Sequence, residues 1–194
     1  MTAVALESPE ESRKTAFVGM VMGLASWAML FASLFFAYAM VRLRAPGWPP
    51  EGTAPLPRLM PGFNTLILLA SSVVLHLGVV RRPGTDRPGA LVRTLWTTIG
   101  LGSLFLLLQT GLWVALWRSG FQIGSGPYGS VFYGLTVFHA VHVLAGLVAL
   151  AWLIPGANRG DYTSNQQNAV RLSALFWHFV DVVWVVMYVA VYLV

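Results

Sequence analysis

The amino-acid sequence predicts an all-α fold, a polytopic membrane protein built as a bundle of five transmembrane helices. Of its 194 residues, 57% are hydrophobic and only 10% are charged, whereas a soluble domain carries about 25% charged residues. The mean hydropathy is +0.69. Charged residues divide the chain into five long apolar stretches. Each stretch can supply the roughly 20 apolar residues that a spanning helix needs.

The expected helices occupy residues 17–41, 62–80, 94–117, 130–153 and 171–193. Residues 1–16 are expected to form a cytoplasmic tail, because their early glutamates and the lack of a cleavage pattern do not fit a removable signal peptide. Residues 17–194 then form a single transmembrane domain. Proline and glycine punctuate the connections, and Pro155-Gly156 is expected to end the fourth helix.

The distribution of basic residues predicts the orientation. The tail, the second loop and the fourth loop together hold Arg13, Lys14, Arg81, Arg82, Arg87, Arg93, Arg159 and Arg171. The opposite side holds Arg42, Arg44, Arg58 and Arg118. The N-terminus is therefore expected in the cytoplasm and the C-terminus outside. Because the basic residues are spread over short loops rather than gathered on one face, we expect no nucleic-acid partner.

The chain contains no cysteine. This excludes disulfides, thiolate metal sites, iron–sulfur clusters and covalently attached c-type haem.

All four histidines and one of the seven acids fall inside the expected helices: His76, His139, His142, His178 and Asp181. Such residues are costly in a membrane and usually face the bundle interior with a partner. At 1.5 Å per residue, Asp181 lies about 15 Å and His142 about 18 Å into the membrane, from opposite sides. The two therefore share a level, and we expect Asp181 to bond to a histidine of the fourth helix or to His178.

Three interpretations of the cluster His139, His142, His178 and Asp181 compete. Polar contacts that hold packed helices together are favoured. A proton relay or a lipid-linked electrostatic role is the second interpretation, and a metal site is the third, although no metal is expected. His76 stands alone on the second helix and is interpreted as a hydrogen-bonded packing residue. Trp177, Trp184 and Tyr188 follow one stripe of the fifth helix, which indicates packing or lipid contact.

Several segments together resemble one known family. The fourth helix contains Thr136-Val137-Phe138-His139-Ala140-Val141-His142-Val143, and the fifth contains Phe176-Trp177-His178-Phe179-Val180-Asp181-Val182-Val183-Trp184. Asn64-Thr65 on the second helix and Gln109 on the third belong to the same pattern. From about residue 17 to the end, the sequence resembles cytochrome c oxidase subunit III and its quinol-oxidase relatives, in the short five-helix bacterial form.

The resemblance implies a subunit without a redox centre of its own, in a complex that reduces oxygen to water with electrons from cytochrome c or quinol. Haem and copper would reside in partner subunit I, with subunit II in the same complex. The resemblance further implies bound structural phospholipid, a role in assembly and in sustained proton uptake by the catalytic subunit, and a place in the bacterial inner membrane.

This sequence departs from the family pattern at three positions. A glutamate of the first helix is replaced by Trp27, a glutamate of the third by Leu112, and an acid before the fifth-helix motif by Arg171. A role that depends on the first-helix carboxylate is therefore not assigned. Two alternatives stay open: the related accessory subunit of a nitric oxide reductase, and a small membrane transporter or metal-binding protein.

Overall fold

The computed structural model describes residues 9–48, 50, 56–79, 89–162 and 167–193, and every regular element within those ranges is helical. The elements are α1 (Pro9–Arg44), α2 (Leu59–Val79), α3 (Ala90–Arg118), α4 (Pro127–Arg159), α5 (Asn168–Tyr188) and a closing π-helical turn, η1 (Val189–Leu193). In this part of the chain, five helices are long and apolar enough to span a membrane. The predicted fold class is confirmed.

The first helix begins earlier than predicted. It starts at Pro9, so the second half of the expected tail is helical, while residues 1–8 lie outside the described part of the chain. The first turn carries Glu10 and Glu11, and negative charge is stabilising at a helix N-terminus. Lys14 adds a 2.8 Å ion pair with Glu10 one turn away. These contacts extend the helix beyond its apolar segment.

The prediction that Pro155-Gly156 ends the fourth helix is wrong. The helix α4 runs through Pro155 to Arg159 and closes at Gly160, which has a φ of 76°. A proline removes one backbone donor and so costs the helix one hydrogen bond, but the last turn still forms beyond it. Glycine adopts the left-handed conformation without steric penalty. The Gly160 N–H then donates to the Ala157 carbonyl at 3.2 Å.

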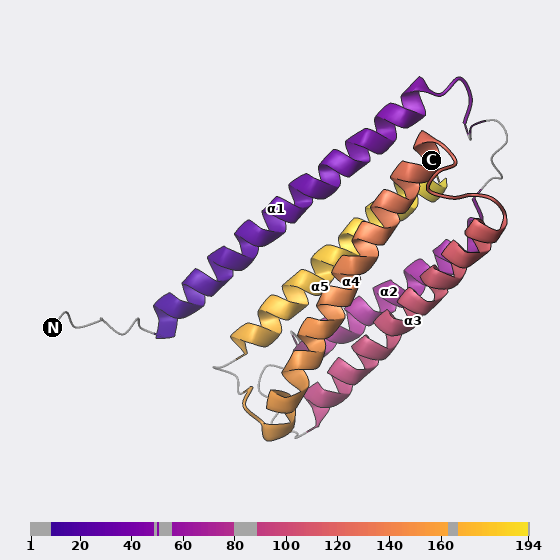
Figure 1. The fold of residues 1–194 in the computed structure, drawn as a ribbon. Coiled ribbons are helices and arrows are strands. Elements are labelled where there is room, and N and C mark those ends of the chain that lie inside the picture. Colours follow the sequence, from indigo (N-terminus) through magenta and orange to yellow (C-terminus); the bar gives the residue numbers. More distant parts are fainter. Residues whose placement is uncertain (1–8, 49, 51–55, 80–88, 163–166, 194) are drawn as a thin grey trace.

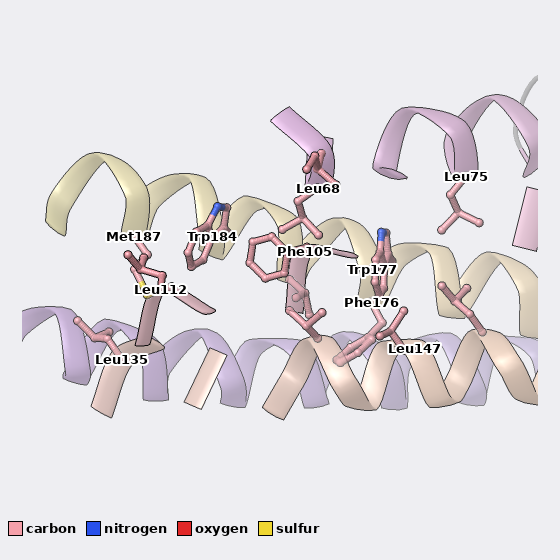
Figure 2. Close-up of a cluster of buried hydrophobic side chains, with 14 of the residues drawn as sticks. Leu68, Leu75, Phe105, Leu112, Leu135, Leu147, Phe176, Trp177, Trp184 and Met187 are labelled. Carbon is pink, nitrogen blue, oxygen red and sulfur yellow. The ribbon is translucent and has the colours of Figure 1, made fainter. Parts of the chain in front are cut away.

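Helices α2 to α5 pack together along their lengths, with α5 and α4 beside α2 and α3 (Figure 1). One apolar core fills the space between them. Each helix contributes a side chain that is at most 1% exposed: Leu68 of α2, Phe105 of α3, Leu135 of α4 and Trp184 of α5. Figure 2 shows these side chains among others of the same cluster.

Two glycines allow the helices to approach Trp177. A Cβ atom at Gly102 of α3 would lie 2.7 Å from the indole ring, and one at Gly146 of α4 would lie 2.8 Å from it. No side chain fits at such distances without displacing its neighbour. Small residues thus let two helix backbones close around one large side chain.

Helix α1 is different, because it lies along the edge of the bundle (Figure 1). It packs on α4 and α5, and only 6% of its apolar span is buried. Phe31 and Tyr38, at 2% and 3% exposure, are its buried large side chains. Along the rest of the helix, apolar side chains such as Met29 and Phe36 face outward.

Candidate functional site

The four residues predicted to form one polar cluster lie in two separate places. Both residues of α4, His139 and His142, contact aromatic rings of α1. The two residues of α5, His178 and Asp181, face Ser72 of α2. The structure therefore brings each predicted pair to one face of its helix but does not join the two pairs.

Ser72 connects α2 to both polar residues of α5. Its Oγ lies 2.6 Å from Nδ1 of His178, and its side chain lies next to the carboxyl group of Asp181. A hydroxyl has one proton to donate. When Ser72 donates to the carboxylate, its oxygen accepts from a protonated Nδ1 of His178. Asp181 is thus linked to His178 through a serine, instead of bonding directly to a histidine as predicted.

The Asp181 carboxyl group is deeply placed and incompletely paired. The residue is 6% exposed, and its Oδ1 atom has no hydrogen-bond partner within the described residues. The same holds for Nε2 of His178. No cationic side chain of the described chain forms an ion pair with Asp181. A charge that is buried without a counter-ion is costly.

His76 extends this group towards one end of the bundle. Its ring centroid is 5.6 Å from that of His178, and its side chain is exposed. The residue lies three positions before the last residue of α2, or about 4.5 Å along the helix. His76 therefore has a second imidazole as its neighbour, and its interpretation as a hydrogen-bonded packing residue stays a prediction.

On α4, His142 joins the edge helix to the bundle. Its Nδ1 lies 2.8 Å from the Phe138 carbonyl oxygen of its own helix. Its ring meets Trp27 and Phe31 of α1, both at centroid distances of 5.2 Å. An imidazole that is satisfied by its own backbone and surrounded by aromatic edges acts as a packing residue.

His139 is the most enclosed of the four histidines, at 1% exposure. Its ring lies 5.2 Å from Trp184 and 6.1 Å from Phe105, measured between centroids. Within the described residues, neither of its ring nitrogens has a hydrogen-bond partner. His139 therefore belongs to the aromatic core instead of pairing with Asp181.

Sequence reasoning missed the hydroxyl partners of the two core tryptophans. The indole N–H of Trp177 donates to Ser71 at 3.1 Å, and that of Trp184 donates to Thr65 at 2.9 Å. Both acceptors lie on α2. Seven residues separate the two tryptophans and six separate the two acceptors, which is the signal expected for antiparallel helices that share a face.

The same tryptophans were candidates for lipid contact, and that expectation is corrected here. Trp177 and Trp184 are 1% and 0% exposed, and Figure 2 shows both rings inside the core. Their N–H groups need an acceptor, and α2 supplies one to each, so packing against protein prevails over lipid. Tyr188 is half-buried, with its hydroxyl 3.5 Å from the Arg58 carbonyl oxygen.

The polar side chains of the site contact neighbouring helices by hydrogen bonds and ring contacts. In the part of the chain that the structure describes, no three histidine or carboxylate side chains gather closely enough to hold a metal ion. His178 with Asp181 and His139 with His142 are instead directed to different neighbours.

The departures from the family pattern have clear structural outcomes. Trp27 stands in edge contact with His142 and Phe176, with both centroid distances 5.2 Å. Leu112 is 3% exposed in the apolar core, and Arg171 is exposed near the start of α5. At Trp27, an aromatic contact between α1 and its neighbours therefore occupies the place of a carboxylate.

Comparison with known proteins gives a consistent result. The model of the family "Cytochrome c oxidase subunit III" matches residues 9–194. The chain is similar to cytochrome c oxidase subunit 3 of Thermostichus vulcanus, with 32% identity over 99% of this chain and 94% of the relative. The corresponding protein of Synechocystis sp. is 37% identical over 90% of this chain and 74% of its own length. That of Sus scrofa is 36% identical over 90% and 67%.

Proposed function

Since the chain belongs to the cytochrome c oxidase subunit III family, we propose that it is the non-catalytic third subunit of a haem–copper terminal oxidase in aerobic respiration. Family membership implies a complex with other oxidase subunits. The observation that carries the proposal is the match over nearly the whole chain, including the motifs around His139 and Asp181. The partner subunit I would hold the haems and copper, and subunit II would complete the complex.

The role proposed for this subunit is to support assembly, to retain phospholipid and to sustain proton uptake by the catalytic subunit. The exposed apolar side chains of α1, among them Phe17, Met29 and Phe36, support the lipid part of the proposal, because this surface needs acyl chains or protein to cover it. The polar side chains support the assembly part of the proposal. Ser72 of α2 bonds to His178 of α5 beside Asp181, while His139 and His142 of α4 pack against aromatic rings of α5 and α1.

The proposed setting is the bacterial inner membrane, with the N-terminus in the cytoplasm and the C-terminus outside. Arg13, Lys14 and Arg93 lie at one end of the helices, and Arg42 and Arg118 lie at the other. The second loop, with Arg81, Arg82 and Arg87, lies outside the described residues. The orientation is tested with the single variants Ser12→Cys and Ser119→Cys, labelled in intact cells with a thiol reagent that does not cross the membrane. Only the cysteine at position 119 should react.

Affinity purification tests the complex. A tagged chain extracted in mild detergent should co-purify with a haem–copper subunit. The purified sample should then show oxidised and reduced haem spectra. Recovery of the chain alone, without haem absorbance, contradicts the proposal. Recovery with a nitric oxide reductase would identify the accessory subunit of that enzyme. Stoichiometric metal lost on His139→Ala or His142→Ala would instead identify a metal-binding membrane protein.

A further inference from the structure

We propose that His76, His178, Ser72 and Asp181 form a proton relay that leads from the exposed end of α2 to a buried carboxyl group in the middle of the bundle. The relay lies within this chain and needs no residue of a partner. The inference therefore goes beyond the proposed function. It is argued from the contact between α2 and α5 at Ser71, Ser72, Trp177 and His178, which we call the seam.

The four side chains are neighbours along α2 and α5. The rings of His76 and His178 have centroids 5.6 Å apart. Nδ1 of His178 lies 2.6 Å from the Ser72 hydroxyl oxygen, and the Ser72 side chain lies next to the carboxyl group of Asp181. A hydroxyl group can donate and accept a proton, and a neutral imidazole donates a proton from one ring nitrogen while it accepts at the other. Neighbouring groups of this kind can pass a proton along the series when the rings and the hydroxyl turn towards one another.

The series also has a direction. His76 is exposed and lies near the end of α2, whereas Asp181 is 6% exposed. His76 is four residues, about 6 Å, from the level of Ser72 on α2, and Asp181 is three residues, about 4.5 Å, from His178 on α5. Because the two helices are antiparallel, these steps add to about 10 Å of depth. The relay thus leads from the end of α2 to the interior of the bundle.

One inward transfer can be written with every proton accounted for. His76 takes a proton from water and passes it to Nε2 of His178, whose own Nδ1 proton moves to the Ser72 oxygen. The Ser72 hydroxyl releases its original proton to the Asp181 carboxylate, which becomes a carboxylic acid. Nε2 of His178 has no competing partner within the described chain. Rotation of the hydroxyl and exchange of the imidazole tautomer then restore the starting arrangement.

The surroundings of Asp181 favour storage of this proton. No Lys or Arg of the described helices pairs with the carboxyl group, and an unpaired charge at this depth is costly. The groups of α4 that titrate near this level, His139 and His142, are directed to Trp184 and Trp27. α1 presents Trp27 and Phe31 to the bundle here, neither of which titrates. The histidines on the side of Asp181 that faces α2 are His178 and His76.

Infrared spectroscopy of the purified complex tests the proposal. If no complex is recovered, the full-length chain in detergent is measured instead. The C=O stretching band of a protonated carboxyl group should shift in D2O, and Asp181→Asn should remove that band. Labelling with [4-13C]aspartate should displace the same band in the unmodified protein, so the assignment holds even if the variant does not fold. The spectral readout is independent of whether an oxidase subunit co-purifies.

The kinetics of exchange separate a relay from a static contact. His76→Leu should keep the band but slow its shift in D2O by about tenfold or more. Ser72→Ala should slow it as well, whereas Ser33→Ala, on the exposed face of α1, should leave it unchanged. A spectrum without an Asp181 C=O band overturns the proposal. The proposal is also overturned if the band shifts in D2O as fast in His76→Leu or Ser72→Ala as in the unmodified chain.

Discussion

The seam between α2 and α5 and the contact of α1 with α4 hold helices together by different means. Across the first, Ser71 and Thr65 accept hydrogen bonds from Trp177 and Trp184, and Ser72 binds His178. Across the second, aromatic rings meet edge to face, as Phe31 does with Phe138 at 5.8 Å. The first region is buried and joined by directional bonds, and the second is shallow and non-directional.

This difference shows how a membrane protein specifies one helix arrangement. Lipid tails are as apolar as leucine, so apolar contact alone distinguishes weakly between protein and lipid neighbours. A hydrogen bond such as that from Trp184 to Thr65 requires one register and one partner. The bundle of α2 to α5 is therefore fixed within the chain, whereas α1 keeps a large surface for other molecules.

The largest expected loss of stability is at the buried contact between α2 and α5. Trp177→Ala removes a ring enclosed by Gly102 and Gly146 and leaves the Ser71 hydroxyl without its donor. The free energy of unfolding should fall by about 3–5 kcal/mol, measured by reversible unfolding in detergent. Trp152→Ala, at 83% exposure, is the matched control and should change stability by about 0.5 kcal/mol at most. Equal effects would remove the distinction between core and surface tryptophans.

A second test adds one carbon atom where two helices are closest. Gly102→Ala places a Cβ 2.7 Å from Trp177 and 2.9 Å from Leu147, and overpacking of this kind costs about 1–3 kcal/mol. Gly111→Ala, on the same helix with no neighbour within 4 Å, should be neutral or slightly stabilising. Thermal unfolding of the two variants compares them directly. A tolerated Gly102→Ala would show that the core yields more easily than its packing indicates.

Asp181→Ala tests the polar part of the seam. The change removes the carboxyl group beside the Ser72 hydroxyl and should cost about 1–3 kcal/mol in the stability of the subunit or its docking. The haem spectrum of the catalytic subunit should be retained. If the spectrum disappears while the complex stays assembled, the cluster does more than hold helices together. Asp161→Ala, at an exposed ion pair with Arg159, is the control and should cost less than about 1 kcal/mol.

The smallest effect is expected where α1 meets α4. A double-mutant cycle on Trp27 and His142, whose rings are 5.2 Å apart, should give a coupling energy of about 0.5–1.5 kcal/mol. The free energy of unfolding is measured for the unmodified protein, the two single alanine variants and the double variant. The coupling energy is the part of the double variant's effect that is not the sum of the single effects. A coupling as large as the effect of Trp177→Ala would mean that α1 is held as firmly as the core.

Much of this architecture follows from the sequence. Five apolar segments and their polar interruptions predict the helices, because the bilayer fixes the length of a span. The ends were harder to predict. α1 starts at Pro9 and α4 passes through Pro155, because Glu10, Glu11 and Gly160 supply local stabilisation that hydropathy does not register.

The partners of the site residues were only partly predictable. Helix periodicity puts His178 and Asp181 on one face, but depth alone could not choose between α2 and α4 as the neighbour. Ser72 was overlooked because a serine in an apolar helix can bond to its own backbone. The choice depends on the rotation of each helix about its axis, and that rotation is set by packing, such as Trp177 between Gly102 and Gly146.

The beginning of α1 can be used to measure how the surroundings of the molecule orient a helix. Residues 10–19 are exposed, and this segment of about 15 Å extends beyond the support of the other described helices. Its tilt is consequently set by the medium. A pair of spin labels at Ser12 and Asn158 would report that tilt as a distance, which should differ between detergent micelle, lipid bilayer and assembled complex.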